Sequence, residues 1–263
     1  MPLAFEDRLR ASRNTDGGFG PIEGAASEAE PTALAALALD DDGSRRWLLA
    51  NQRGDGGFGP VVGSVVRDDT GVAALALANG AERERALDHL VATFGSNGPG
   101  AEGDALGWPW SDGTHGWVEP TSWALLALRA HRPNEAARLA DGLALLRSRE
   151  SVGGGWNFGD RTMLGVDLHP YVQTTALALF AVHGLDPGLA SRGLDVLLRR
   201  WEAEAAGLLS LAVAAAALRR FEAPAAPVAA RRLEAFDPSG ADTVALAWAT
   251  IALGPGLRSL EVP

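Results

Sequence analysis

The strongest constraint on the fold is a unit of about thirty residues that recurs along the chain. Residues 45–77 form one complete copy, RRWLLANQRGDGGFGPVVGSVVRDDTGVAALAL. A short helical segment at 45–52 is broken by the glycine-rich turn at 54–57, and a second helix begins at the sequence DDT of residues 68–70. This second helix is apolar on nearly every side, so other parts of the protein must surround it. Each unit is therefore predicted to pair an amphipathic outer helix with a buried inner helix.

The threonine near the start of the inner helix places the same unit elsewhere in the chain. Glu-Pro-Thr occurs at 30–32 and at 119–121, Gln-Thr at 173–174 and Asp-Thr at 242–243. Glutamate before proline favours a helix start, because proline has no N–H to leave unpaired and the carboxylate faces the positive helix end. Six inner helices are predicted, with starts near Pro31, Asp69, Pro120, Gln173, Gly207 and Asp242.

The turn between the two helices carries a family resemblance. Trp47-Leu48, then Gln52, then Gly56-Gly57-Phe58 resembles the glutamine-tryptophan motif of the terpenoid cyclase and protein prenyltransferase superfamily, which includes the squalene-hopene cyclases, with Phe58 where tryptophan is usual. The resemblance covers nearly the whole chain. It implies an all-α fold, namely an α6/α6 toroid of six inner and six outer helices with glycine-rich turns, as a single domain over residues 1–263. Because the motif is a turn and packing device, it is specific for the fold and not for a reaction.

Composition excludes several classes of function. A net charge of −10 and a pI near 5.0 argue against nucleic acid as a partner. The absence of cysteine excludes a thiol nucleophile, a disulfide framework and the cysteine-containing zinc site of the prenyltransferases, so no metal or other cofactor is expected. Residues 1–13 are charged and have no apolar segment typical of a signal peptide, so a cytoplasmic location is expected.

Two aspartates are the candidate catalytic residues. The resembled class II terpenoid cyclases protonate an alkene with an Asp-x-Asp-Asp motif, and residues 66–70, VRDDT, keep the last two aspartates and the threonine. Val66 stands at the first position. The resemblance implies catalytic roles for Asp68 and Asp69, with Asp68 in the position of the protonating aspartate. The competing and favoured interpretation is that both cap the helix, like the acids at the other inner-helix starts.

Two long loops, at 95–118 and 153–171, carry most of the remaining side chains that can do chemistry. If all the turns lie at one end of the ring, both loops converge on one central cavity, which is then the ligand site. Aromatic faces there could stabilise carbocations or hold an isoprenoid chain, whereas the alternative is that they pack the loops over the ring. The predicted substrate-binding residues are Trp108, Trp110, Asp112, His115, Trp117, Trp156, Phe158, Asp167, His169 and Tyr171.

Three functions compete on these grounds. The first is an isoprenoid-handling enzyme that performs proton-initiated carbocation cyclisation or isomerisation on a hydrophobic substrate. The second is a non-catalytic toroid that binds a lipid or a partner protein, which is favoured by Val66 and by the presence of one toroid where class II cyclases usually use two. The third is a glycan hydrolase or lyase, because paired carboxylates beside tryptophan suit sugars. A homodimer, a second toroid as partner and weak contact with a membrane surface are left open.

Overall fold

The computed structural model describes residues 3–62, 65–96 and 106–262, and most of them are helical. Part of the first long loop, 97–105, lies outside the described residues. The only strands among the described residues form two short antiparallel pairs, β1 (Val61–Val62) with β2 (Val65–Val66) and β3 (Thr162–Met163) with β4 (Val166–Asp167). The all-α class predicted from the sequence is confirmed.

The even-numbered helices begin within two residues of the six predicted inner-helix starts. They bury nearly their whole surface: α8 buries ten of its eleven residues. Their bounds are α2 (Ala29–Leu39), α4 (Thr70–Ala76), α6 (Val118–His131), α8 (Val172–Val182), α10 (Leu208–Arg220) and α12 (Thr243–Leu253).

The odd-numbered helices are amphipathic and bury one face only. Helix α3 buries two of its nine residues, Ser44 and Leu48. The bounds of this set are α1 (Leu3–Ala11), α3 (Asp42–Ala50), α5 (Ala81–Ala92), α7 (Ala136–Ser148), α9 (Pro187–Glu204) and α11 (Ala226–Glu234), and a 3-10 helix, η1 (Pro255–Leu260), follows α12.

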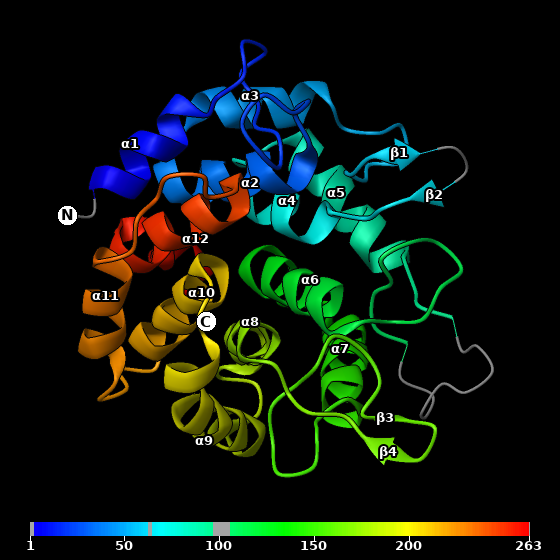
Figure 1. Cartoon of the computed structure of the whole chain (residues 1–263). Coiled ribbons are helices and arrows are strands. Elements are labelled where there is room, and N and C mark those ends of the chain that lie inside the picture. The colour runs from blue at the N-terminus through cyan, green and yellow to red at the C-terminus, as the bar shows by residue number, and fades with distance from the viewer. Residues whose placement is uncertain (1–2, 63–64, 97–105, 263) are drawn as a thin grey trace.

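The even-numbered helices form a closed series of contacts. Each contacts the next, from α2 through α4, α6, α8 and α10 to α12, and α12 contacts α2. The odd-numbered helices pack on their outer side, with α3 on α2, α5 on α4, α7 on α6, α9 on α8, α11 on α10 and α1 on α12 (Figure 1). The backbone N–H of Thr243 donates to the carbonyl of Pro21 at 3.0 Å, which joins the last unit to the first.

Four of the units share one hydrogen bond between the turn and the inner helix. In each, the backbone N–H of a buried aromatic residue in the turn donates to the hydroxyl of the helix threonine. The pairs are Phe19 with Thr32, Phe58 with Thr70 and Trp108 with Thr121, each at 2.9 Å, and Trp156 with Thr175 at 3.0 Å. A buried backbone N–H needs an acceptor, so this bond fixes each turn against the start of its inner helix.

The threonine of the fourth unit differs from the sequence interpretation by one residue. The sequence placed the register at Thr174, but the hydroxyl that accepts from Trp156 belongs to Thr175. The hydroxyl of Thr174 is buried and makes no hydrogen bond. The threonine of α8 that binds the aromatic residue of the turn therefore lies one position later in the sequence than predicted.

Helices α4 and α6 approach each other closely at Gly71. A Cβ atom added there would lie 2.7 Å from Cβ of Trp123 and 2.8 Å from the backbone nitrogen of Ala124. Only glycine allows this separation. The close approach brings the start of α4 against the side chain of Trp123.

Candidate functional site

Asp68 lies just before α4 and forms a buried pair with His89 of α5. His89 Nε2 lies 2.8 Å from Asp68 Oδ2, and the Thr70 N–H donates to Asp68 Oδ1 at 2.9 Å. Burial alone would raise the pKa of Asp68, but the hydrogen bond and charge of His89 and the bonds from Thr70 lower it below the ordinary value. Burial likewise opposes the charged form of His89, yet Asp68 raises the pKa of the imidazole. Asp68 is therefore held as a carboxylate with both oxygens engaged.

Asp69 has the opposite environment. Its side chain is 2% exposed, Oδ1 lies 3.0 Å from Arg67 Nε, and Oδ2 has no hydrogen-bond partner. Burial raises the pKa of Asp69 to about 7, Arg67 lowers it in part, and the charges of Glu30 and Asp68 raise it further. The Asp69 side chain accepts no bond from the backbone of α4, so it does not act as a helix cap. Asp69 can thus hold a proton near neutral pH.

The charges around Asp69 come from three inner helices. Glu30 of α2 and Asp69 share the guanidinium of Arg67, which also lies over the ring of Trp110 at 5.0 Å from its centroid. Burial and then the charge of Glu30 raise the pKa of Glu119, in the first turn of α6, to about 8. Three carboxyl groups therefore lie near one guanidinium, and this arrangement favours the neutral form of two of them.

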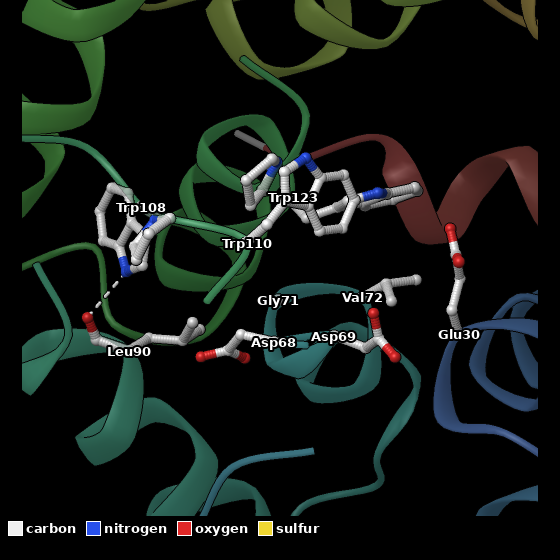
Figure 2. Close-up of a pocket in the computed structure, with 11 residues that line it drawn as sticks. Glu30, Asp68, Asp69, Gly71, Val72, Leu90, Trp108, Trp110 and Trp123 are labelled. Atoms are coloured by element: carbon white, nitrogen blue, oxygen red, sulfur yellow. Dashed lines mark hydrogen bonds between the residues drawn. The ribbon is translucent and has the colours of Figure 1, made fainter. Parts of the chain in front are cut away.

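Both aspartates line a small aromatic pocket, shown in Figure 2 with Asp69 below the ring of Trp123. Its aromatic lining is Trp108, Trp110 and Trp123. The volume is about 10 Å³. Since this is about the minimum that holds one water molecule, the acid oxygens face a nearly filled, apolar space.

A second and larger cavity lies between the inner helices and shares Glu30 and Trp123 with the small pocket. We call it the ring cavity. Its volume is about 220 Å³, and its lining is Glu30, Glu119, Trp123, Gln173, Leu177, Leu209, Val213, Val244 and Trp248. Trp123 and Trp248 pack against each other with ring centroids 5.8 Å apart.

The predicted substrate-binding residues do not share one cavity. Trp108 and Trp156 are buried, and their indole N–H groups donate to the backbone carbonyls of Leu90 and Leu146. Trp108 also lines the small pocket with Trp110. Tryptophan in these two turns therefore fills space between helices, which agrees with the packing alternative.

The other predicted residues lie on the surface side of the loops. An open groove of about 460 Å³ is lined by Trp117, Phe158, Asp167, His169 and Tyr171. Asp112 lines a different surface hollow, beside His89 and Phe94 of the third unit. His115 is partly buried, and its Nδ1 makes no hydrogen bond. The two long loops thus distribute their side chains over separate hollows, where the sequence predicted a single mouth.

Sequence reasoning did not single out five residues that the structure brings to the site. These are Glu30, His89, Glu119, Trp123 and Trp248. The two glutamates were interpreted as helix-start signals, and both do lie in first helical turns. A usable signal was present in the tryptophans, because each stands in an inner helix made mainly of small and aliphatic residues.

Metal ligation and membrane crossing find no support in the described ranges. No group of three or more His, Asp or Glu side chains there could hold a metal ion. Among the same residues, no helix combines the length and the apolar character needed to cross a bilayer.

Comparison with known proteins gives one relationship. Drimenyl diphosphate synthase from Streptomyces showdoensis is 35% identical to this chain over 172 residues, which cover 57% of this chain and 31% of the relative. The match thus spans about a third of the length of that relative. No protein-family model matches. The identity supports a terpenoid cyclase-like relationship.

Proposed function

We propose that this chain is an isoprenoid-handling enzyme of the class II terpenoid cyclase type, in which Asp69 protonates an alkene. We further propose that the twelve α-helices form a single α6/α6 toroid, which the closed series of contacts from α2 to α12 and back to α2 supports. The observation that carries the function is the Asp69 carboxyl: it is buried, its pKa is raised to about 7, its Oδ2 is unpaired, and the residue lines an aromatic pocket.

The chemistry that we propose for Asp69 is proton transfer to carbon. The proton moves from Asp69 Oδ2 to one alkene carbon, the π electrons form the new C–H bond, and the neighbouring carbon becomes a carbocation. In a cyclisation, a second alkene attacks this cation to form a C–C bond, and the new cation that results loses a neighbouring C–H proton to solvent. In an isomerisation, the first cation loses a neighbouring C–H proton directly. The faces of Trp110 and Trp123 stabilise the cation through their π electrons, and solvent returns a proton to Asp69.

This assignment reverses the order that the resemblance implied. Asp68 occupies the position of the family's protonating aspartate, but its two oxygens are occupied by His89 and Thr70, and its pKa is lowered. A carboxylate in that state is a poor acid near neutral pH. We propose that the Asp68–His89 pair positions the start of α4 and that Asp69 is the donor.

The test is product formation in deuterated water. The protein is incubated with acyclic isoprenoids of different length, supplied as hydrocarbons, alcohols and diphosphates, and the products are separated and weighed by mass spectrometry. We expect a cyclised or isomerised product with one deuterium, and Asp69→Asn should lower its rate at least ~100-fold. Asp195→Asn, an exposed aspartate on α9, is the matched control. A rate that falls with Asp68→Asn and not with Asp69→Asn would remove Asp69 from the role.

A second candidate is a non-catalytic toroid that binds a lipid. It is favoured by the volumes, because the pocket beside Asp69 is nearly filled and the larger ring cavity lies beyond Trp123. This candidate predicts that isoprenoids bind without any deuterium entering them.

A further inference from the structure

We infer that the ring cavity binds an uncharged isoprenoid of about two units, and that the carboxyl groups at its edge exclude the corresponding diphosphate. The inference rests on the proposed function and names its substrate class. The matched relative is named for a diphosphate, so the inference separates this chain from it.

The apolar lining defines the kind of ligand. Trp123 and Trp248 form one wall, and the aliphatic residues Leu177, Val213 and Val244 complete much of the rest. A cavity of about 150 Å³ holds benzene, so one of about 220 Å³ has room for roughly ten carbon atoms. Two isoprene units contain that many carbons. Tryptophan faces and branched aliphatic groups match a branched, unsaturated hydrocarbon better than a polar ligand.

The polar part of the lining is acidic or neutral. Glu30, Glu119 and Gln173 are its only polar residues among those the structure describes, and none can supply a positive charge. The guanidinium of Arg67, which contacts the lining residue Glu30, is already paired with Glu30 and Asp69 and lies over Trp110. A diphosphate would therefore lose its hydration next to carboxyl groups and gain no cation in return.

The imidazole of His89, which lies beside Asp68, is also engaged, because it is paired with that carboxylate. The residues outside the description, 1–2, 63–64, 97–105 and 263, contain no Arg, Lys or His in their sequence.

Equilibrium binding tests the inference separately from turnover. Geraniol and geranyl diphosphate have the same ten-carbon chain and differ at the head group. Both are titrated into the Asp69→Asn variant, in which the proposed reaction is blocked, and binding is followed by tryptophan fluorescence and checked by native mass spectrometry. We expect geraniol to bind and geranyl diphosphate to bind at least ~100-fold more weakly. Equal or tighter binding of the diphosphate, or no binding of either compound, overturns the inference.

Two sets of variants locate the effect. Glu30→Gln should raise the affinity for geranyl diphosphate and leave that for geraniol within about threefold, since the variant removes a carboxylate charge and frees Arg67 from one of its partners. Val244→Trp should fill the ring cavity and abolish geraniol binding, whereas Val228→Trp, on the exposed side of α11, should not. Retained geraniol binding in Val244→Trp places the ligand elsewhere and overturns the inference.

Failure of the proposed function gives a different pattern. If geraniol binds as expected but no wild-type product carries deuterium, the reaction is wrong and the binding inference stands. If the wild-type protein turns over a prenyl diphosphate through Asp69, the function stands and the inference is wrong.

Discussion

Replacing Asp69 by asparagine should stabilise the protein at neutral pH, which is the reverse of what a helix-cap aspartate would do. Asparagine has nearly the same shape and cannot ionise. The wild-type carboxyl is 2% exposed, and its pKa is raised from 3.8 to about 7 in the folded state. The folded state therefore disfavours the ionised form of Asp69, and the asparagine variant does not carry this energetic penalty.

The size of the effect follows from the pKa shift. The shift is about three units, and each unit corresponds to about 1.4 kcal/mol, so the ceiling is about 4 kcal/mol. Below the unfolded pKa of 3.8 the group is protonated in both states and contributes no difference. As pH rises toward 7, the unfolded state releases the proton first and is favoured, so wild-type stability falls. Asp69→Asn should match wild type near pH 4 and exceed it by up to about 4 kcal/mol near pH 8.

The assay is urea unfolding followed by circular dichroism at a series of pH values from about 4 to about 8. Only the difference between variant and wild type is used, because groups distant from Asp69 titrate equally in both. Asp242→Asn is the matched control, since its side chain does cap a helix, accepting from the Ala245 N–H at 2.7 Å, and asparagine caps equally well. Its curve should stay parallel to wild type.

Asp68→Asn should behave in the opposite way. The lowered pKa of Asp68 means that its contribution to stability is present above its unfolded pKa and is lost as pH falls through the folded value. Asp68→Asn removes the carboxylate that pairs with His89, and this should lower the free energy of unfolding by roughly 1.5 to 3 kcal/mol at neutral pH. If Asp69→Asn instead loses stability at pH 8 by the 0.5 to 2 kcal/mol typical of a lost cap, Asp69 is an ordinary ionised cap and its assignment as an acid fails.

Two further predictions concern the packing that positions the site. Thr175→Val should lower the free energy of unfolding in urea by about 1 to 3 kcal/mol, because it leaves the buried Trp156 N–H without an acceptor. Thr174→Val should be neutral or stabilising, because the Thr174 hydroxyl is buried and unpaired. Equal costs for the two variants would contradict the register. Gly71→Ala should lower the free energy of unfolding by about 1 to 3 kcal/mol, because the added methyl group overpacks against α6. Gly54→Ala is the neutral control, since no atom lies within 4 Å of the Cβ position there. An unchanged urea midpoint for Gly71→Ala would contradict the close approach of α4 and α6.

The helices were predictable because the signals that specify them are local. Glu-Pro-Thr and Asp-Asp-Thr each act within a few residues, and the three inner-helix starts that carry them were located to within two positions. The fourth register was missed for a physical reason. Phe58 and Thr70 are 12 residues apart, but the loop that contains the β3–β4 hairpin separates Trp156 from Thr175 by 19. With two adjacent threonines and no fixed spacing, the sequence could not say which one faces the turn.

The site was less predictable because it depends on contacts between distant residues. The pKa of Asp69 is set by burial and by Glu30 and Arg67, and Glu30 reaches it only because α2 packs on α4. The same holds for His89, which is 21 residues from Asp68 and was not singled out. The positions of the loop side chains were hard to predict for the opposite reason. Their chemistry was visible in the sequence, but the side on which each would lie depends on the path of the loops.

The cluster around Asp69 costs the fold stability, and this cost argues for a function. A purely structural position could carry asparagine, which would keep the shape and remove the penalty of a buried acid. Instead, the charge of Glu30 from α2 raises the pKa of Asp69 further, while Arg67 offsets only part of the shift. Glu119 from α6 adds a second buried carboxyl whose pKa is also raised. Natural sequences depart from the most stable choice chiefly where function requires it. An acid kept neutral beside tryptophan faces is such a departure, and carbocation chemistry is the use to which its unpaired oxygen is best suited.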